Sequence, residues 1–290
     1  MANVKILADS TCDLTSDLIK RYNIGVIPLY VTLDKDSLQD GVQVTPRDLY
    51  EYFDRTKKTP KTSTPTIVDF VGIFEPYVRQ GQEIVFVGIS EAMSGTVNNA
   101  RLAAAEFPDA KIRCVNSKSL STGVGLQVLA ACEMAEQGLD AEQIEAALLE
   151  LVPRVHASFV PDSLTYLYHG GRCSAVQSIG SMLLKIKPRI EVVGGEMKPT
   201  EKYRGTYASV ARQYAQSVLG TAQPGYIERI EPKRVFVTSS LDTDQTAIDV
   251  ALEEIENLHY FKEVIQTQAG CIITSHCGPN TLGILYEEKA

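Results

Sequence analysis

The fold is decided by residues 84–107, IVFVGISEAMSGTVNNARLAAAEF, which combine a strand pattern with a helix pattern. The apolar run at 84–90 favours a strand that a parallel sheet buries on both faces, and the stretch from Val97 to Phe107 favours a helix. Between them, Met93-Ser94-Gly95-Thr96 places a hydroxyl and free backbone N–H groups where the helix begins. A helix N-terminus attracts negative charge, so this junction predicts a binding site for an anionic group.

The N-terminal half repeats this arrangement of hydroxyl residues beside strands and helices. Asp9-Ser10-Thr11 follows the strand-like run Val4–Ala8, and Asn116-Ser117-Lys118-Ser119 follows the run at 111–115. Thr62-Ser63-Thr64-Pro65 is expected to open another helix. Because the carboxyl ends of parallel strands meet at one edge of a sheet, we expect these hydroxyl loops to converge on one anionic head group.

Composition excludes several classes of protein. The chain has 290 residues, of which 44% are hydrophobic, and a net charge of −8, so a nucleic-acid partner, which requires basic surface, is not expected. The six cysteines show neither CxxC pairs nor zinc-ligand spacing. No apolar run reaches the roughly 20 residues that a membrane span needs, and a strand begins too early to leave room for a signal peptide. We therefore expect a soluble, cytoplasmic protein without a bound metal.

The order of patterns predicts two α/β domains, residues 1–153 and 154–290. In the first, short apolar runs alternate with amphipathic stretches, which is typical of a mostly parallel sheet flanked by helices. After Pro153 the pattern changes, and strands and helices are less regularly alternated. The helices expected there are 164–168, 176–185, 208–219 and 243–258, and the strands are 155–160, 189–193, 234–239 and 263–267.

Two catalytic interpretations are open from the residues alone. Ser94 is a candidate nucleophile, although the first glycine of a G-x-S-x-G elbow is missing, and only His276, in the loop-like Ser275–Pro279, is a candidate base. A serine hydrolase therefore stays an alternative to a binding site. Nucleotide-binding motifs are absent, and the isolated Gly123-Val124-Gly125 favours close packing of a helix. Arg172 and Arg204, each beside glycine, are either surface charges or contacts to an anion or a partner.

Seven strings occur together in an order that resembles the DegV family. They are Asp9-Ser-Thr-Cys-Asp-Leu14, Thr62-Ser-Thr-Pro65, Met93-Ser-Gly-Thr96, Leu167-Tyr-His-Gly-Gly-Arg172, Leu183-Leu-Lys-Ile-Lys-Pro188, Lys202-Tyr-Arg204 and His276-Cys-Gly-Pro-Asn-Thr-Leu-Gly283. The resemblance covers the whole chain. It implies a two-domain α/β fold with a lipid site between the domains.

The resemblance also implies a function without catalysis or a cofactor. DegV-like proteins bind a long-chain fatty acid, and the better understood members present its carboxylate to a separate bacterial fatty acid kinase, which makes acyl-phosphate for phospholipid synthesis. By position, the hydroxyls of Thr62 and Ser94 and the backbone N–H of Gly95 would bind the carboxylate. His276 would lie near this head group. Arg172 and Arg204 would lie at the pocket mouth or contact the kinase.

The chain departs from the family pattern at three positions near these strings. Cys173 replaces a branched aliphatic residue, and Glu91 and Met93 replace a small or aliphatic lead-in to Ser94. Met93 is expected to affect the choice of acyl chain. A stand-alone lipid chaperone or sensor without a kinase is a further alternative. The acidic surface predicts that any contact with an anionic membrane is weak and transient.

Overall fold

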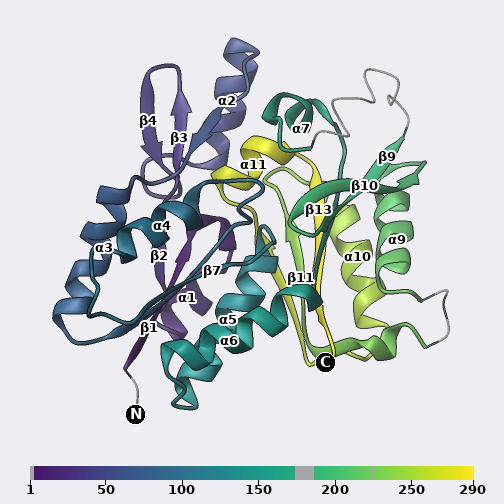
Figure 1. Cartoon of the computed structure of the whole chain (residues 1–290). Coiled ribbons are helices and arrows are strands. Elements are labelled where there is room, and N and C mark those ends of the chain that lie inside the picture. Colours follow the sequence, from purple (N-terminus) through teal and green to yellow (C-terminus); the bar gives the residue numbers. More distant parts are fainter. Residues whose placement is uncertain (1–2, 174–185, 222, 224) are drawn as a thin grey trace.

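The computed structural model describes residues 3–173, 186–221, 223 and 225–290. Its main part is built of five layers, in which helices and sheets alternate (Figure 1). A four-stranded sheet and a six-stranded sheet lie on either side of a central helical layer, and each is covered on its outer face by further helices. The expected α/β architecture, with a parallel sheet flanked by helices and a second sheet after it, is confirmed.

The first sheet is wholly parallel and has the strand order β2-β1-β6-β7. Its strands are β1 (Val4–Asp9), β2 (Gly25–Ile27), β6 (Glu83–Gly88) and β7 (Ile112–Asn116). Successive side chains of a strand point to opposite faces, and both faces are apolar here. Leu7 and Phe86 belong to one buried cluster, whereas Ile6 and Val85 belong to another.

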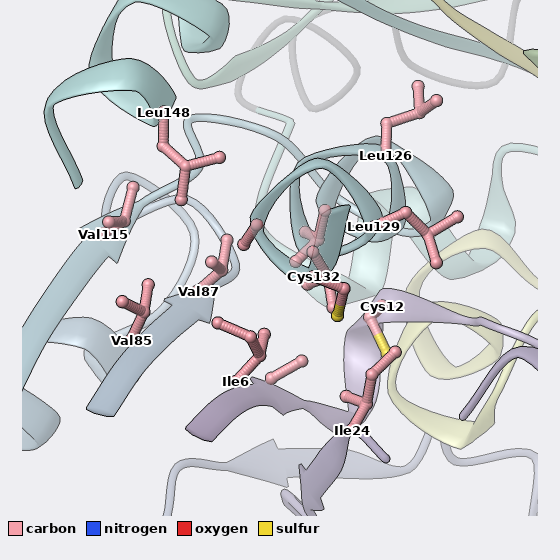
Figure 2. Packing of buried hydrophobic residues seen from close by; sticks show 14 of the residues in the cluster. Ile6, Cys12, Ile24, Val85, Val87, Val115, Leu126, Leu129, Cys132 and Leu148 are labelled. Atoms are coloured by element: carbon pink, nitrogen blue, oxygen red, sulfur yellow. The ribbon is translucent and has the colours of Figure 1, made fainter. Parts of the chain in front are cut away.

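Different helices cover the two faces of this sheet. Helices α3 (Ile67–Arg79) and α4 (Thr96–Ala104) pack on the outer face. Helices α5 (Thr122–Glu136) and α6 (Ala141–Leu151) pack on the inner face, where Leu148 lies beside the strand residues Val87 and Val115 (Figure 2). Leu129 of α5 belongs to the same buried cluster. The short α1 (Ser16–Arg21) and the 3-10 turn η1 (Ser10–Cys12) lie between β1 and β2 in sequence. The strand–loop–helix prediction for 84–107 is thus correct.

A small antiparallel sheet, β4-β3-β5, carries the next part of the site. Its strands are β3 (Tyr30–Leu33), β4 (Asp36–Gln39) and β5 (Lys61–Ser63), and α2 (Pro46–Thr56) connects β4 to β5. The β-rich run from Gly25 to Leu33 therefore divides at Pro28, which cannot donate to a strand ladder, into strands of two sheets. Thr62 lies in β5 and does not open a helix: the N-cap of α3 is Thr66, which accepts from the N–H of Asp69.

The six-stranded sheet is mixed and has the order β10-β9-β8-β13-β11-β12. Its strands are β8 (Val155–Pro161), β9 (Lys187–Val193), β10 (Glu196–Tyr203), β11 (Ile230–Ser239), β12 (Glu263–Gln268) and β13 (Thr281–Glu288). Helices α9 (Tyr207–Val218) and α10 (Gln245–Glu256) cover its outer face. Lys202 and Tyr203 end strand β10, and Arg204 follows that strand.

Helix α5 joins the two halves of the molecule. Its inner-layer cluster contains Ile6 and Val85 from the first sheet and Ala157, Phe236 and Leu285 from the second. The first sheet ends before residue 153 and the second begins after it, although the boundary of the two domains itself stays a prediction. Two 3-10 turns, η2 (Val152–Arg154) and η4 (Ile227–Arg229), precede strands β8 and β11.

Two short helices complete the region above the central layer. They are α7 (Thr165–Gly170) and α11 (Cys271–Cys277), which pack against each other. The segment around His276 was expected to be a loop, but it is helix α11. The helix expected at 176–185 lies outside the described residues. Within the described ranges, no helix has the length and apolar character needed to cross a bilayer.

Candidate functional site

A cavity of about 430 Å³ opens between the small antiparallel sheet, the Ser94 loop and helix α11. This volume lies in the range of sites for small ligands. Residues of both halves of the chain form its wall: Leu29, Thr62, Ser63, Thr64, Ile89, Glu91, Ala92, Met93, Ser94, Gly95, Leu120, Arg172, Met197, Ile272, Ile273, His276 and Cys277. The wall includes the polar side chains of Thr62, Ser94 and His276, and most of its remaining residues are apolar.

The hydroxyl of Thr62 and the imidazole of His276 form a pair in this wall. The Thr62 Oγ1 atom lies 3.0 Å from Nε2 of His276. Burial, with a further contribution from the positive charge of Arg172, lowers the pKa of His276 to about 4. The imidazole is therefore neutral at physiological pH, and one of its two nitrogens carries no proton.

The surroundings of His276 indicate which nitrogen carries the proton. The Nδ1 atom is buried, and no described residue forms a hydrogen bond with it. A buried N–H without an acceptor is rarer in proteins than an unpaired acceptor, so the favoured tautomer has its proton on Nε2. His276 then donates to Thr62, and the O–H of Thr62 is left to donate into the cavity.

The hydroxyl of Ser94 also has a hydrogen-bond partner in the protein, which is the hydroxyl of Thr96. Its Oγ atom lies 2.8 Å from Oγ1 of the fully buried Thr96, and it also lies 3.4 Å from the backbone N–H of Thr96. When Thr96 donates to Ser94, the O–H of Ser94 points to a ligand. The neighbouring Gly95 is the N-cap of α4 and is exposed, and no described residue accepts a hydrogen bond from its N–H. Three donors are thus available in the cavity wall.

The Gly170-Gly171-Arg172 string packs directly against this site. Gly171 has a φ of +68° and ends helix α7 in the left-handed conformation, as glycine permits. Gly170 approaches His276 so closely that a Cβ built there would lie 2.4 Å from Nδ1. Arg172 lines the cavity and donates to the backbone oxygen of Gly170 at 2.8 Å. Arg204 is exposed and is not part of the cavity wall.

Two of the four hydroxyl loops do not reach the cavity, contrary to the expected convergence. In the first, the buried Asp9 accepts hydrogen bonds from Thr11 and from the backbone N–H of Ile89. In the other, Ser117 accepts from the backbone N–H of Ser119 at 3.1 Å. These polar groups stabilise the loops at the sheet edge, and of the four loops only those of Thr62 and Ser94 line the cavity.

A narrow second cavity of about 20 Å³ continues the first toward the centre of the molecule, because Leu120, Ile273 and Cys277 line both. Many of its wall residues carry hydroxyls, but most of these are bonded to the protein. Ser121 donates to Asp13, and Ser158 pairs with Tyr214. The other bonded hydroxyls are those of Thr238, Ser240 and Thr281. The wall therefore presents mainly apolar atoms to a ligand.

The geometry does not assemble a serine hydrolase. His276 contacts Thr62 rather than Ser94, and among the described residues no carboxylate accepts a hydrogen bond from its Nδ1. An imidazole whose pKa is lowered to about 4 is also a poor general base near neutral pH. The described residues contain no group of three or more potential metal ligands. The arrangement favours binding of an anion by neutral donors.

The residues that depart from the family pattern lie at or near the cavity. Met93 and Glu91 belong to its wall, and Glu91 forms an ion pair with Arg101 that reduces its effect on an anion. Cys173 is buried, and its thiol lies 3.3 Å from the backbone oxygen of Met197. Sequence reasoning missed Met197, Ile272 and Ile273 as wall residues because β10 and α11 were not recognised.

Comparison with known proteins identifies close relatives over the whole chain. A model of the DegV family, described as an uncharacterised protein family, matches residues 3–289. A DegV domain-containing protein of Caldanaerobacter subterraneus subsp. tengcongensis is 31% identical over 289 residues, which cover 100% of both chains.

Solved structures with the same fold include proteins that bind fatty acids. A DegV family protein from Thermus thermophilus, described by its fatty acid binding, matches with a TM-score of 0.87 and 28% identity, covering 99% of this chain and 100% of the other. A stearic acid-binding protein from Eubacterium ventriosum matches with a TM-score of 0.83 and 25% identity, covering 100% and 99%. These structures indicate fatty acids as the ligands of relatives, and none of the comparisons indicates a cofactor.

Proposed function

This chain belongs to the DegV family, and on that premise we propose that it binds one long-chain fatty acid in the cavity described above. The carboxylate accepts hydrogen bonds from the hydroxyls of Thr62 and Ser94 and from the backbone N–H of Gly95. The observation that carries the proposal is the presence of these donors in the wall of one mostly apolar cavity. The solved relatives that bind fatty acids support the choice of ligand.

The tail supplies most of the binding energy in this proposal. Each buried methylene contributes about 0.8 kcal/mol, so about fourteen methylenes contribute roughly 11 kcal/mol before the cost of ordering the chain. The tail follows the apolar wall toward the narrow cavity beyond Leu120, Ile273 and Cys277. Because that cavity is narrow, a long chain must displace some of its wall residues when it enters.

The hydrogen bonds to the head group orient the carboxylate, whereas the tail supplies most of the binding free energy. Neutral donors leave the carboxylate charged, whereas a buried arginine paired with it would compete with attack on a phosphoryl group. The part of the wall that carries these donors also lies near the surface, because Ser63 and Gly95 are exposed. A bound carboxylate is therefore accessible to a second protein.

This accessibility supports the finer part of the proposal, which is that the protein presents its fatty acid to a separate ATP-dependent kinase. A carboxylate oxygen attacks the γ-phosphorus of ATP, the bond to ADP breaks, and acyl-phosphate and ADP form. The protein itself performs no chemical step. Arg172 and Arg204, which are both exposed, are the proposed contacts to the kinase. We place this reaction in the cytoplasm and in phospholipid synthesis, with transient membrane contact when lipid is exchanged.

The first experiment is native mass spectrometry of the purified protein, followed by extraction and identification of the bound lipid. One fatty acid per chain is expected, and its length and double bonds identify the preferred ligand. An empty protein that also takes up neither oleate nor palmitate would contradict the proposal. Hydrolysis of an acyl ester that is lost in Ser94→Ala would instead support the hydrolase.

A second experiment tests presentation to the kinase. The loaded protein is incubated with ATP and a DegV-associated fatty acid kinase, and acyl-phosphate is trapped with hydroxylamine. Formation of the hydroxamate is expected only when both proteins are present. A fatty acid that stays unmodified with every kinase of the same cell would favour a stand-alone chaperone or sensor.

A further inference from the structure

Helix α11, which carries His276, is bound at both ends by one small sheet. Near its C-terminal end, His276 pairs with Thr62 of β5 at 3.0 Å. At its N-terminal end, the backbone N–H of Cys271 donates to Oδ1 of Asp40 at 2.9 Å. Asp40 directly follows β4, and its own N–H donates to the oxygen of Leu29 beside β3. The same three-stranded sheet therefore fixes the two ends of the helix.

A second carboxylate contacts the same end of α11. The backbone N–H of Gly270 donates to Oδ1 of Asp13 at 2.8 Å, and Ser121 of the α5 N-cap donates to Oδ2 at 2.5 Å. Ser10 similarly donates to Oδ2 of Asp40 at 2.7 Å. Both carboxyl groups are buried, and within the described residues neither forms an ion pair with a basic side chain. They accept the N–H groups that the first turn of a helix leaves unpaired.

The helix is short enough to transmit a displacement from one end to the other. From Cys271 to His276 the rise is about 7.5 Å, at 1.5 Å per residue. Gly170 lies against one side of the imidazole and Thr62 bonds the other, so His276 has little freedom to compensate for a shift of the helix. A movement at Gly270 and Cys271 therefore changes the contact between His276 and Thr62.

We propose that Asp40, together with Asp13, is a positioning residue for the carboxylate-binding hydroxyl of Thr62. By fixing the N-terminal end of α11, these carboxylates set where His276 meets Thr62, and thus where the Thr62 O–H points. Neither residue lines the cavity. The inference rests on the proposed fatty acid binding. It adds to that site two residues that do not themselves contact the ligand.

The test compares Asp40→Ala with Asp36→Ala, a matched control at the exposed start of β4. Binding of oleate labelled with ¹³C at the carboxyl carbon is followed by NMR and by titration. Asp40→Ala is expected to shift the carboxyl resonance and to weaken oleate binding roughly tenfold, the effect of losing one hydrogen bond to a charged group. Asp36→Ala should match the wild type in both. Binding of oleyl alcohol, which has no carboxylate, should be unchanged in both variants.

A double-mutant cycle separates positioning from a general loss of structure. If Asp40 acts through His276 and Thr62, Asp40→Ala should weaken oleate binding little further once Thr62→Val is present. If the fold-losses of oleate affinity in the two single variants instead multiply in the double variant, the proposal is overturned. Asp40→Asn should restore binding, because an amide oxygen can accept from Cys271 and the amide nitrogen can donate to Ser10.

A second variant and the wild-type protein separate a folding defect from a failure of the proposal. If Asp40→Ala does not fold, Ser10→Ala removes one hydrogen bond from Asp40 without changing the carboxylate, and it should shift the carboxyl resonance in the same direction by a smaller amount. A resonance identical to the wild type would overturn the proposal. Failure of the wild-type protein to bind oleate would instead contradict the proposed function, so the two failures are distinguishable.

Discussion

Thr62 and His276 are 214 residues apart in the sequence, yet Oγ1 of the one lies 3.0 Å from Nε2 of the other. The contact joins the small antiparallel sheet to a helix of the C-terminal half. Because His276 is neutral and its Nδ1 has no partner among the described residues, the imidazole acts as a donor toward Thr62. A second contact of this kind joins Thr96 to Ser94. Each hydroxyl that we propose to bind the carboxylate thus has a hydroxyl or an imidazole within hydrogen-bond distance.

Removing either hydroxyl should weaken binding of the carboxylate and spare binding of the tail. We expect Thr62→Val and Ser94→Ala each to reduce the affinity for oleate roughly tenfold, since a hydrogen bond to a charged group contributes about 1.5–3 kcal/mol. The affinity for oleyl alcohol should change much less, because its tail contacts are the same. Titration calorimetry with the two ligands measures the difference. Equal losses for both ligands, or kinase turnover of the Ser94→Ala complex at the wild-type rate, would contradict the assignment.

Gly170 should be required for the position of His276. In Gly170→Ala the new methyl group would lie 2.4 Å from Nδ1, so either the imidazole or the end of α7 must move. We expect a weaker Thr62–His276 contact, a changed imidazole ¹⁵N resonance and reduced oleate affinity. The matched control is Gly72→Ala in helix α3, where the residue is exposed and a Cβ would meet no atom within 4 Å. An unchanged His276 resonance in Gly170→Ala would show that the site tolerates the methyl group.

The buried Asp13 should make the protein less stable as the pH rises. Burial, which outweighs hydrogen bonds from Ser121 and Gly270, raises the pKa of Asp13 from its ordinary value of 3.8 to about 8. The folded state therefore binds a proton that the unfolded state releases between pH 4 and pH 8, so the free energy of unfolding falls over this range as the pH increases. The raised pKa of Asp9, about 6, acts in the same direction. The lowered pKa of His276 acts in the opposite direction between about pH 4 and 6.5.

Asp13→Asn isolates this contribution, because an amide can still accept from Gly270 and donate to Ser121. The stability of the wild type relative to Asp13→Asn should decrease by at most about 1 kcal/mol for each pH unit between pH 5 and pH 8. Urea unfolding at several pH values measures it, with the exposed Asp36→Asn as a control whose difference from the wild type should not vary with pH. Parallel stability curves for the wild type and Asp13→Asn would mean that Asp13 is already ionised in the folded protein.

The sequence predicts those features whose causes are local. The strand, loop and helix around Ser94 follow from apolar periodicity and a hydroxyl–glycine junction. The residues alone place Ser94, Gly95 and the Thr62 loop at an anion site, whereas the binding role of the Thr62 hydroxyl and the place of His276 near the head group come only from the resemblance to the family. Strand β5 has three residues and helix α11 has seven, which are too short for a periodic pattern to emerge. Their meeting depends on the packing of the whole chain, so no local signal indicates it.

Among the local features that the sequence predicts correctly is the close packing of the glycines in α5, and it can be tested without a ligand. A Cβ at Gly125 would lie 2.8 Å from the backbone oxygen of Cys12 and 2.8 Å from Cδ2 of Leu14. Since the backbone cannot yield as a flexible side chain does, Gly125→Ala should destabilise the protein by about 1–3 kcal/mol, the usual cost of overpacking.

Gly72→Ala is the matched control. Gly72 is exposed in helix α3, and a Cβ there would meet no atom within 4 Å. This variant should instead gain up to about 1 kcal/mol from the higher helix propensity of alanine. Urea unfolding of both variants gives the two signs directly, and a Gly125→Ala protein as stable as the wild type would mean that α5 can move away from the loop after β1.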